Sequence, residues 1–529
     1  MADGNVSAEM QNVGAGDTQQ VWLKSIEDEL KRKESYGSFS TFIMGHSIHR
    51  VPRQLREVNT LAYEPMVVAI GPYKKSRKLQ PSVTESFMRI SAAKLVMAML
   101  NIEAEGFQAF TQRVVGDQHS VEKLAMEYER APPYGEDALR AVFALDACFV
   151  TCFLVFLGCG GMSRRSYFPW LGDTFAEELA RRVEKEFKVP KRLVTSILRD
   201  VFLFENQIPL SLVKGIMTSI INTGGAKAGT DMPEIKQDNG EEKAEEFLGR
   251  CIEEVVECAN PFRADATPYG GITQGAPCIV HRHTHLLDCL YSTVTMDSRD
   301  ERVIRSRVQS AIGITRGSEM QGAAVAARMG SAPTAVESAV HLRRAGIAFK
   351  PSATVGGTGV GGGNVVDIWF DKASATLFLP RLRIGPDSEA VLRNLAAYEM
   401  VALQRAEVGC YLALMDDLID TAQDVQVLRL SGVLEHSLRN DEELAEMWNG
   451  MCKNLQVLYE TSTLAEAYAA IKDHLCRRMR YKKLWELYAE FSNRYLSAPW
   501  LTASVLAATL LLVLTIAQTI YSAAIYYKS

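Results

Sequence analysis

The stretch Asp200–Leu212 reads DVFLFENQIPLSL and places three adjacent polar residues between two apolar runs. Glu205, Asn206 and Gln207 could form a catalytic cluster, because carboxyl groups with perturbed pKa values gather at active sites. They could instead secure the end of a helix. The apolar residues before them follow helical spacing, and Pro209 disfavours helix at Ile208. The two amides then lie where terminal carbonyl groups need partners, so we favour a structural role.

Glu205 requires a partner of its own if it lies near apolar surface. A buried carboxylate is stable only when a cation or backbone donors compensate its charge. Arg56, far upstream in the chain, is one candidate for that partner.

Composition limits the class of protein. The chain has 529 residues, of which 47% are apolar and 23% charged, so it can bury a large core. A net charge of −5 gives no basic excess, and we expect no nucleic-acid partner. None of the ten cysteines forms a CxxC pair. We therefore expect a reducing compartment and neither a disulfide framework nor a zinc framework.

The two ends of the chain differ in character. Residues 1–40 begin with a polar stretch that we expect to be disordered, followed by an amphipathic helix, and they contain no secretory signal. From 495 to 527 the chain has no charged residue. About 20 apolar residues suffice to span a bilayer. Trp500, Tyr521 and Tyr526 lie where an aromatic belt is expected. We predict a C-terminal transmembrane anchor over 495–529.

The charges that flank this segment predict its orientation. Basic residues precede it at Arg477, Arg478, Arg480, Lys482, Lys483 and Arg494, and only Lys528 follows it. The positive-inside rule then places the N-terminal body in the cytosol and predicts a single-pass, tail-anchored protein. The length of the apolar run favours a thick bilayer such as the plasma membrane over an endomembrane.

The body over 41–494 is expected to be mainly α-helical. An apolar run over 137–157 predicts a buried helix rather than a second span, since Asp146 lies within it. The segment MVVAI, residues 66–70, is a short strand or a buried segment between breakers. VVDIWF and ATLFLPRLRI predict two strands that form a small β-hairpin around DKASA. Mobile insertions are expected near 222–243, 305–333 and 351–364.

Two apparent ligand motifs carry little weight. GTGVGG, residues 357–362, satisfies GxGxxG but lacks a preceding strand and a following helix, so we expect no cofactor there. HRHTH places His281, His283 and His285 two apart, which in a strand could hold a metal. The following LLDCLY indicates a helix, which spreads the three histidines apart. We assign no catalytic, cofactor-binding or metal-ligating residue.

Several blocks in order along the chain resemble one family. IHRVPRQLREVNTLAYEPMVVAIGPYKK resembles the opening signature of the plant domain-of-unknown-function 247 family, also called uncharacterised protein family 0481. FALDACFVTCFL, DVFLFENQIPLSL, HLLD, SAVHLRRAGIAFK and LRNLAAYEM resemble later blocks, and the C-terminal apolar segment resembles the family's last block. Lys74 and Lys75 replace the usual histidine after GPY, as in a divergent member. The signature residues, to which we assign structural roles, are Pro52, Arg56, Tyr63, Pro65, Gly71, Pro72, Tyr73, Asp146, Asp200, Glu205, Asn206, Gln207, Pro209, His285, Asp288, Gly346, Asn394, Glu399 and Asp424.

The resemblance implies a plant protein that associates with membranes and has no established biochemical activity. Some grass members are linked genetically to pollen–stigma self-incompatibility, which suggests recognition. Our first hypothesis is therefore a membrane-anchored recognition or scaffold protein with unknown protein partners and the lipid bilayer as its support. The alternative is a membrane-associated enzyme, for example a hydrolase, in which Glu205, Asp146, Asp288 and His285 converge.

Overall fold

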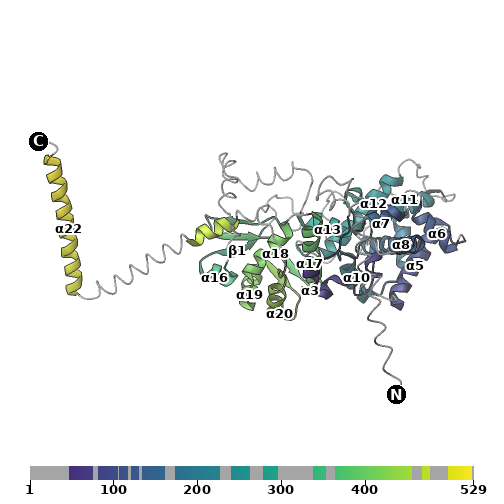
Figure 1. Cartoon of the computed structure of the whole chain (residues 1–529), viewed down its shortest axis with the longest axis horizontal. Coiled ribbons are helices and arrows are strands. Elements are labelled where there is room, and N and C mark those ends of the chain that lie inside the picture. Colours follow the sequence, from purple (N-terminus) through teal and green to yellow (C-terminus); the bar gives the residue numbers. More distant parts are fainter. Residues whose placement is uncertain are drawn as a thin grey trace, which may run out of the picture.

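The structure is a computed structural model of the full chain. It describes residues 47–75, 82–104, 106–116, 121–129, 134–160, 173–226, 240–262, 278–295, 337–352, 364–403, 406–455, 467–476 and 499–526. Within these ranges the chain is mainly helical with a few short strands (Figure 1). The expected N-terminal disorder and leading helix lie outside the described residues, as does the expected insertion at 305–333.

The core is built around helix α8, Glu136–Gly160, which packs against α5, α9, α11 and α12. These neighbours span Val83–Leu100, Asp173–Glu186, Leu210–Ala226 and Gly240–Ala259. A helix that is apolar on all sides is stable in water only when other elements surround it. Phe143, Phe149 and Phe153 of α8 are fully buried, and Phe149 stacks on Phe153 with ring centroids 5.9 Å apart. The predicted buried helix at 137–157 is confirmed.

α8 is also the one helix among the described residues that is long and apolar enough to cross a membrane. Length and composition alone cannot separate a span from a core helix. Inside the folded body, 78% of its apolar window is buried against other helices. Its surroundings therefore make α8 the centre of the core.

Shorter helices complete the body on either side of α8. The first half of the chain contributes α3 (Arg53–Val58), η2 (Thr60–Tyr63), α4 (Pro72–Lys75), α6 (Gly106–Val114), α7 (Val121–Met126), η3 (Lys191–Leu193), α10 (Val194–Val201), η5 (Val280–Arg282) and α13 (Leu286–Thr295). The second half contributes α16 (Ala339–Arg344), α17 (Ser388–Tyr398), the π-helical turn η6 (Glu399–Leu403), α18 (Glu407–Leu418), α19 (Ala422–Leu430) and α20 (Asp441–Asn449).

The strands form two small sheets. β2 (Trp369–Asp371) and β3 (Thr376–Leu379) pair antiparallel, which confirms the hairpin around DKASA. β1 (Ala348–Pro351) joins β3 in parallel. The prediction of one strand over ATLFLPRLRI is wrong: β4 (Leu382–Ile384) leaves this sheet and pairs in parallel with β5 (Leu434–His436). Pro380 separates β3 from β4, and proline cannot donate to a strand ladder.

The segment 66–70 is buried for the most part, but it is irregular rather than a strand. The helix before the ENQ stretch is also shorter than its apolar spacing predicts, because α10 ends at Val201 instead of near Asn206. In both places side chains supply the hydrogen-bond partners that backbone groups of a strand or helix would otherwise supply. Helix also reaches into the expected insertion at 222–243, since α11 extends to Ala226 and α12 begins at Gly240.

The C-terminal segment forms helix α22, Pro499–Tyr526, which Figure 1 draws apart from the body. Side chains between Ala507 and Tyr521 are exposed along its length, including Leu510, Leu512 and Ile520 at 63–64%. The apolar stretch Ala507–Tyr521 is shorter than the length at which α8 qualifies as a possible span. The side chains of Trp500 and Tyr526 lie outside the described residues.

Candidate functional site

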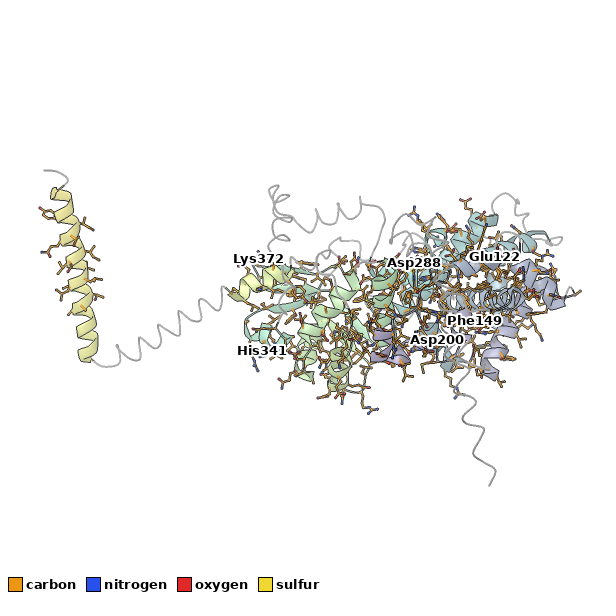
Figure 2. All side chains as sticks on the ribbon, viewed as in Figure 1. Glu122, Phe149, Asp200, Asp288, His341 and Lys372 are labelled. Atoms are coloured by element: carbon orange, nitrogen blue, oxygen red, sulfur yellow. The ribbon has the colours of Figure 1, made fainter. Side chains whose placement is uncertain are left out.

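Buried carboxyl and amide groups from distant parts of the chain surround the irregular segment Met66–Gly71. Asp200, at the end of α10, is fully buried (Figure 2). Its Oδ1 accepts the Met66 N–H at 2.9 Å, and its Oδ2 accepts the N–H groups of Val67 at 2.7 Å and Val68 at 3.0 Å. One carboxylate therefore satisfies three consecutive backbone donors that no strand or helix serves.

Three further side chains serve the rest of the segment. Ala69 N donates to Glu85 Oε1 at 3.0 Å, Ile70 N to Asn206 Oδ1 at 2.6 Å, and Gly71 N to Asp146 Oδ2 at 2.9 Å. All three acceptors are buried. The six successive N–H groups of the segment thus end on four side chains from three helices and one loop.

Two arginines balance the charge that these carboxylates bring inside. Arg89 lies 3.0 Å from Glu85 and 3.3 Å from Asp146, and it donates to the Ala69 carbonyl. Arg199 donates to Asp200 at 2.9 Å and to the Glu64 carbonyl at 3.1 Å. Buried charges are tolerated when they are paired and hydrogen-bonded. Burial raises the pKa of Asp200, whereas the three amides and Arg199 act in the opposite direction.

Glu205 has the partner that the sequence suggested. Arg56 Nη2 donates to Glu205 Oε1, and the Val51 N–H donates to the same oxygen at 2.9 Å. The side chain of Glu205 is 6% exposed and that of Arg56 is 15% exposed. Arg56 also donates to Glu64 at 2.8 Å. The pair joins the ENQ loop to helix α3.

Asn206 and Gln207 take the carbonyl groups left open where α10 ends. Asn206 Nδ2 donates to Asp200 O at 2.8 Å and to Val68 O at 3.0 Å. Gln207 Nε2 donates to Val201 O at 2.8 Å and to Leu203 O at 2.7 Å. These contacts confirm the expectation that both amides serve terminal carbonyls, and they explain why α10 needs no further turn.

The segment Met66–Gly71 lies so close to the loop of Glu205, Asn206 and Gln207 that no side chain fits at Gly71. Its φ is +72°, and a Cβ there would lie 2.5 Å from the Gln207 carbonyl oxygen. Tyr128 Oη donates to the same oxygen at 2.9 Å. Glycine at this position therefore follows from both the left-handed backbone and the contact.

A second group of signature residues lies at the start of α13. His285 is fully buried; its Nδ1 accepts the Asp288 N–H at 3.1 Å, which leaves Nε2 to donate to Ser47 O at 3.2 Å. Asp288 accepts from Tyr398 Oη at 2.9 Å and lies 3.3 Å from His283 Nδ1. Burial lowers the pKa of His285 to about 4, so the imidazole is neutral. Although burial opposes it, the hydrogen bond from His283 and the nearby histidine charges lower the pKa of Asp288 to about 2.

Glu399 caps the N-terminus of helix α18 from the preceding π-helical turn. Its Oε1 accepts the Val408 N–H at 2.9 Å and its Oε2 accepts the Gly409 N–H at 2.7 Å. Tyr291 Oη donates to Oε1 at 2.8 Å. Burial raises the pKa of Glu399 to about 7, although these three donors act in the opposite direction. The carboxyl group therefore titrates near neutrality inside the core.

The remaining signature residues also have structural surroundings. Asn394 bridges η2, the ENQ loop and α17 through Phe204 N at 2.8 Å and Ala62 O at 2.8 Å. Asp424 forms a capping box with Thr421 and accepts Val340 N at 2.8 Å. The others lie at starts, ends or buried faces of elements: Pro52 before α3, Tyr63 buried in η2, Pro65 after η2, Pro72 at the start of α4, Tyr73 bonded to Ile48 O, Pro209 before α11 and Gly346 just after α16.

The four groups proposed for an enzyme do not share a site. Asp146 binds Gly71 and Arg89, Glu205 binds Val51 and Arg56, and only His285 and Asp288 contact each other. Two cavities in the described part of the chain are lined by none of them. The geometry gives these carboxyl groups structural contacts instead of access to a substrate.

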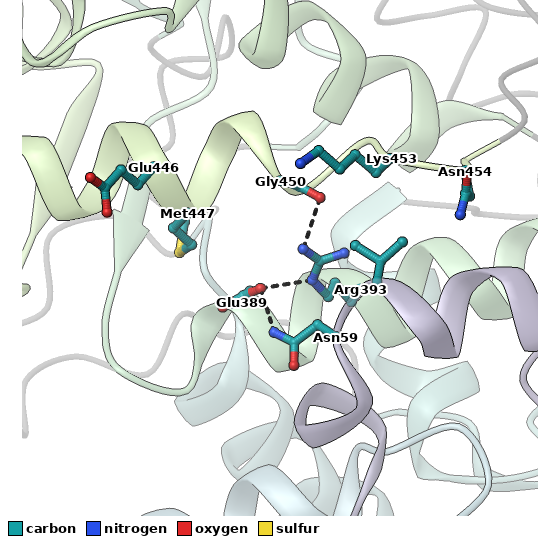
Figure 3. Close-up of a pocket in the computed structure, with 9 residues that line it drawn as sticks. Asn59, Glu389, Arg393, Glu446, Met447, Gly450, Lys453 and Asn454 are labelled. Atoms are coloured by element: carbon teal, nitrogen blue, oxygen red, sulfur yellow. Dashed lines mark hydrogen bonds and ion pairs between the residues drawn. The ribbon is translucent and has the colours of Figure 1, made fainter.

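The larger of those cavities lies where helix α3 meets the C-terminal half of the body (Figure 3). It has a volume of about 560 Å³ and is lined by Val58, Asn59, Glu389, Arg393, Glu446, Met447, Gly450, Lys453 and Asn454. Glu389 accepts from Arg393 at 2.8 Å and from Asn59 at 2.8 Å, and Arg393 donates to Gly450 O at 3.0 Å. Because Glu389 and Arg393 pair with each other and with groups from neighbouring segments, these contacts join α3, α17 and the chain after α20.

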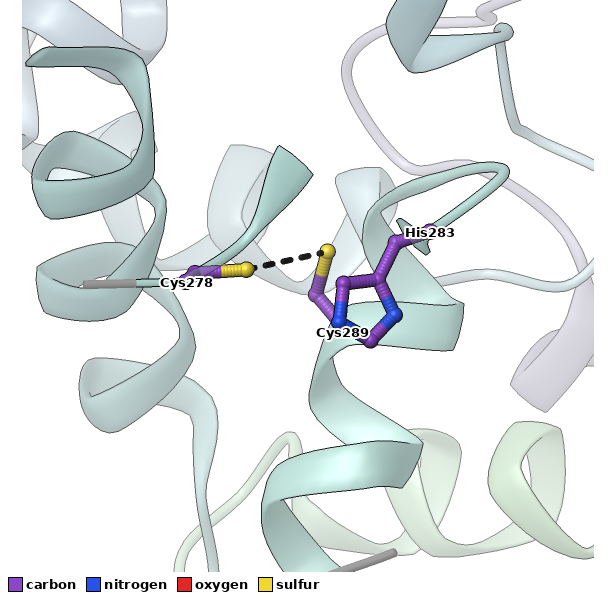
Figure 4. Close-up of side chains that lie close together, drawn as sticks. All are labelled: Cys278, His283 and Cys289. Carbon is purple, nitrogen blue, oxygen red and sulfur yellow. Dashed lines mark hydrogen bonds between the residues drawn. The ribbon is translucent and has the colours of Figure 1, made fainter. Parts of the chain in front are cut away.

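The three histidines of HRHTH separate as expected for a helix start. His281 is exposed beside Glu245, His283 is half-buried beside Asp288, and His285 points into the core. The structure also places Cys278 and Cys289 beside His283, a proximity that the sequence analysis missed (Figure 4). The hydrogen bond with Cys289 lowers the pKa of Cys278 to about 6; burial opposes this and His283 assists it. Five Cys and His residues within the twelve positions 278–289 were the available signal.

Sequence reasoning also missed Glu85 and Arg89. They are four residues apart on the buried face of α5, among Met88 and Ala92. Two opposite charges within an apolar stripe could have indicated a buried pair.

Comparisons with known proteins identify relatives of this chain among plant proteins. A family model described as a plant protein of unknown function, DUF247, matches residues 48–514. The UPF0481 protein At3g02645 of Arabidopsis thaliana is 34% identical over 186 residues, which is 35% of this chain and 32% of that protein. The UPF0481 protein At3g47200 of the same plant is 23% identical over 89% of this chain and 85% of its own. The chain thus spans about a third of the first relative and most of the second. No solved structure matches.

The buried ion pair of Glu205 yields a stability prediction. Glu205→Gln leaves Arg56 short of a partner and should lower the free energy of unfolding of the body by about 3 kcal/mol. Glu57→Gln is the matched control, because its pair with Arg53 is exposed and contributes at most about 0.5 kcal/mol. Thermal and urea unfolding of both variants measure the difference. Equal stability of wild type and Glu205→Gln would remove the structural role.

Glu399 yields a pH prediction. Its pKa is raised in the folded state, so the unfolded chain ionises first as pH rises, and stability falls between about pH 4.5 and 7. Relative to Glu399→Gln, wild type should lose up to about 3 kcal/mol over this window. Urea unfolding at several pH values tests this, with exposed Glu442→Gln as control. A pH-independent difference between wild type and Glu399→Gln would contradict it.

Proposed function

We propose a function for this protein on the premise that it belongs to the plant DUF247 family of proteins of unknown function. It acts as a membrane-anchored recognition or scaffold protein: helix α22 enters the bilayer and the helical body binds other proteins. The exposed apolar surface of α22 is the observation that carries this proposal.

The length of the whole helix α22 and the exposed side chains of its apolar stretch Ala507–Tyr521 support this proposal. Its 28 residues rise about 42 Å, more than the roughly 30 Å of a hydrocarbon core. Between Leu510 and Tyr521 its large apolar side chains are 51–70% exposed. Leaving this surface in water costs about 25 cal/mol for each Å². A lipid bilayer removes the surface from water while the helix satisfies its own backbone. The family match reaches residue 514, within α22.

Flanking charge supports a cytosolic body. Six arginines and lysines lie between 477 and 494, against Lys528 alone on the other side. The positive-inside rule keeps the more basic flank in the cytosol. The length of the span favours the plasma membrane over thinner endomembranes.

The contacts of the signature carboxylates and an exposed apolar stripe on α5 favour recognition over catalysis. The signature carboxylates bind the protein's own backbone, which leaves them no chemistry to perform on a substrate. By contrast, Val83, Phe87 and Ile90 form an apolar stripe at helical spacing on α5 and are 88%, 56% and 51% exposed. Contiguous exposed apolar surface of this kind marks protein contact sites. We place the partner-binding surface on this stripe.

Two charges in α22 test the anchor. Val513→Arg with Leu514→Arg adds roughly 5–7 kcal/mol to the cost of insertion. We expect the double variant to move from the alkaline-washed membrane pellet to the soluble or aggregated fraction. Leu430→Arg, at a 71% exposed leucine of α19, is the matched control and should stay with the membrane. Retention of the double variant in the bilayer would contradict the anchor.

Charges on the α5 stripe test recognition. The double substitution Phe87→Glu and Ile90→Glu should reduce at least about tenfold the recovery of proteins that copurify with the full chain in mild detergent. Phe107→Glu, at a 53% exposed phenylalanine of α6, is the control and should retain them. Membrane association should be equal in both. If both variants retain the same proteins, the stripe is not the recognition surface.

A further inference from the structure

Cys278, His283 and Cys289 bring two thiols and one imidazole together outside the signature network. Cys278 precedes η5, His283 follows it, and Cys289 lies in the first turns of α13. One ligand atom from each lies within 4.8 Å of the other two (Figure 4). Cys289 is buried, and the other two are half-buried, so an ion can reach the group from solvent.

We propose that these three residues form a zinc site with two thiolate ligands and one imidazole ligand. Sulfur and imidazole together suit Zn²⁺ among the common divalent ions. Three protein ligands leave a fourth tetrahedral position for water. Binding releases the protons still held by the two thiols and the proton on Nε2 of a protonated His283, and it involves no change of oxidation state.

The sulfur–sulfur distance fits a shared metal. Zn–S bonds of about 2.3 Å at a tetrahedral angle place two sulfurs about 3.8 Å apart. Cys278 Sγ and Cys289 Sγ are 3.8 Å apart. A disulfide would require about 2.05 Å. The three ligand atoms lie within 4.8 Å of one another. The His283 nitrogen must come about 1 Å closer to the two sulfurs to bind the same ion, and side-chain rotation can provide this movement.

The surroundings of His283 match those of a metal ligand. Metal-bound histidines usually give their second ring nitrogen to a carboxylate, which fixes the ring. His283 Nδ1 lies 3.3 Å from Asp288 Oδ2, which leaves Nε2 to bind the metal. Asp288 is itself held by Thr284 N at 3.0 Å and by Tyr398 Oη at 2.9 Å. The carboxylate that orients the His283 ring is thus itself held in position.

The position of Cys278 is fixed by helix α12. A Cβ at Gly249 would lie 2.3 Å from the Cys278 carbonyl oxygen, so the backbone of Cys278 rests directly on the helix. Only glycine permits this approach. A metal that joins Cys278 to Cys289 would therefore clamp α12 to α13 through the loop between them.

Metal content of the full chain, purified in mild detergent with a reductant and no chelator, tests the site. We expect about one zinc per chain. Cys278→Ser and Cys289→Ser should each lose at least nine-tenths of it. Cys258→Ser, which removes an exposed thiol of α12, is the control and should keep it. Zinc content unchanged in both serine variants, or absent from the wild type after zinc is added in equimolar amount, would overturn the proposal.

Two further measurements separate metal loss from unfolding. Asp288→Asn should weaken zinc binding roughly 10- to 100-fold, measured against a chromogenic chelator. Tyr398→Phe removes the other side-chain donor to Asp288 and should leave the affinity within about twofold. In the wild type, zinc should slow alkylation of Cys278 and Cys289 but not of Cys258. Equal alkylation with and without zinc, or a Cys278–Cys289 disulfide in the zinc-treated protein, would contradict the site.

Discussion

The three backbone N–H groups that Asp200 accepts are the interaction on which the rest of the body depends. Met66 is exposed, Val67 is half-buried and Val68 lies in the interior, and none of them has a neighbouring strand. Glu85, Asn206 and Asp146 serve the next three residues. A buried donor without a partner costs about 1–3 kcal/mol. The four donors from Val68 to Gly71 are buried. Without partners they would cost about 4–12 kcal/mol, which is comparable with the roughly 5–15 kcal/mol that stabilises a typical domain. Folding therefore requires the carboxylates. The carboxylates in turn require the neighbouring arginines, which compensate their charge in the interior.

This constraint explains why the blocks that resemble one family lie far apart in the sequence: their residues contact each other in the fold. Asp200 and Val68 are 132 positions apart, and Asn206 and Ile70 are 136 apart. Substituting one partner leaves a buried charge or a buried amide unpaired. A set of polar residues that resembles an active site in the sequence is thus a framework that holds the opening block against α8, α10 and the ENQ loop. In our proposal, function then falls to the surfaces that this framework leaves exposed, α22 and the stripe on α5.

The sequence predicted those features that depend on local pattern. The buried helix around Asp146, the β-hairpin around DKASA and the role of the ENQ amides at a helix end were predictable from spacing and composition. Arg56 was one candidate partner for Glu205, because a buried carboxylate needs a compensating charge. It could not predict that α10 ends at Val201 or that 66–70 is irregular, because side chains from elsewhere replace the backbone partners there. Glu85, Arg89 and the meeting of Cys278 with Cys289 depend on tertiary contacts that no periodicity encodes. Membrane insertion and partner binding remain proposals drawn from exposed surface.

Hydrogen exchange of the amides from Met66 to Gly71 tests the central claim most directly. In Asp200→Asn, one acceptor oxygen becomes an amide nitrogen, so some of the three N–H groups lose their acceptor. Exchange of this segment should accelerate roughly 10- to 100-fold, with protection of α18 retained. Unchanged protection of Met66–Val68 in the folded variant would contradict the account, because Asp200 would then not be what holds the opening block in the core.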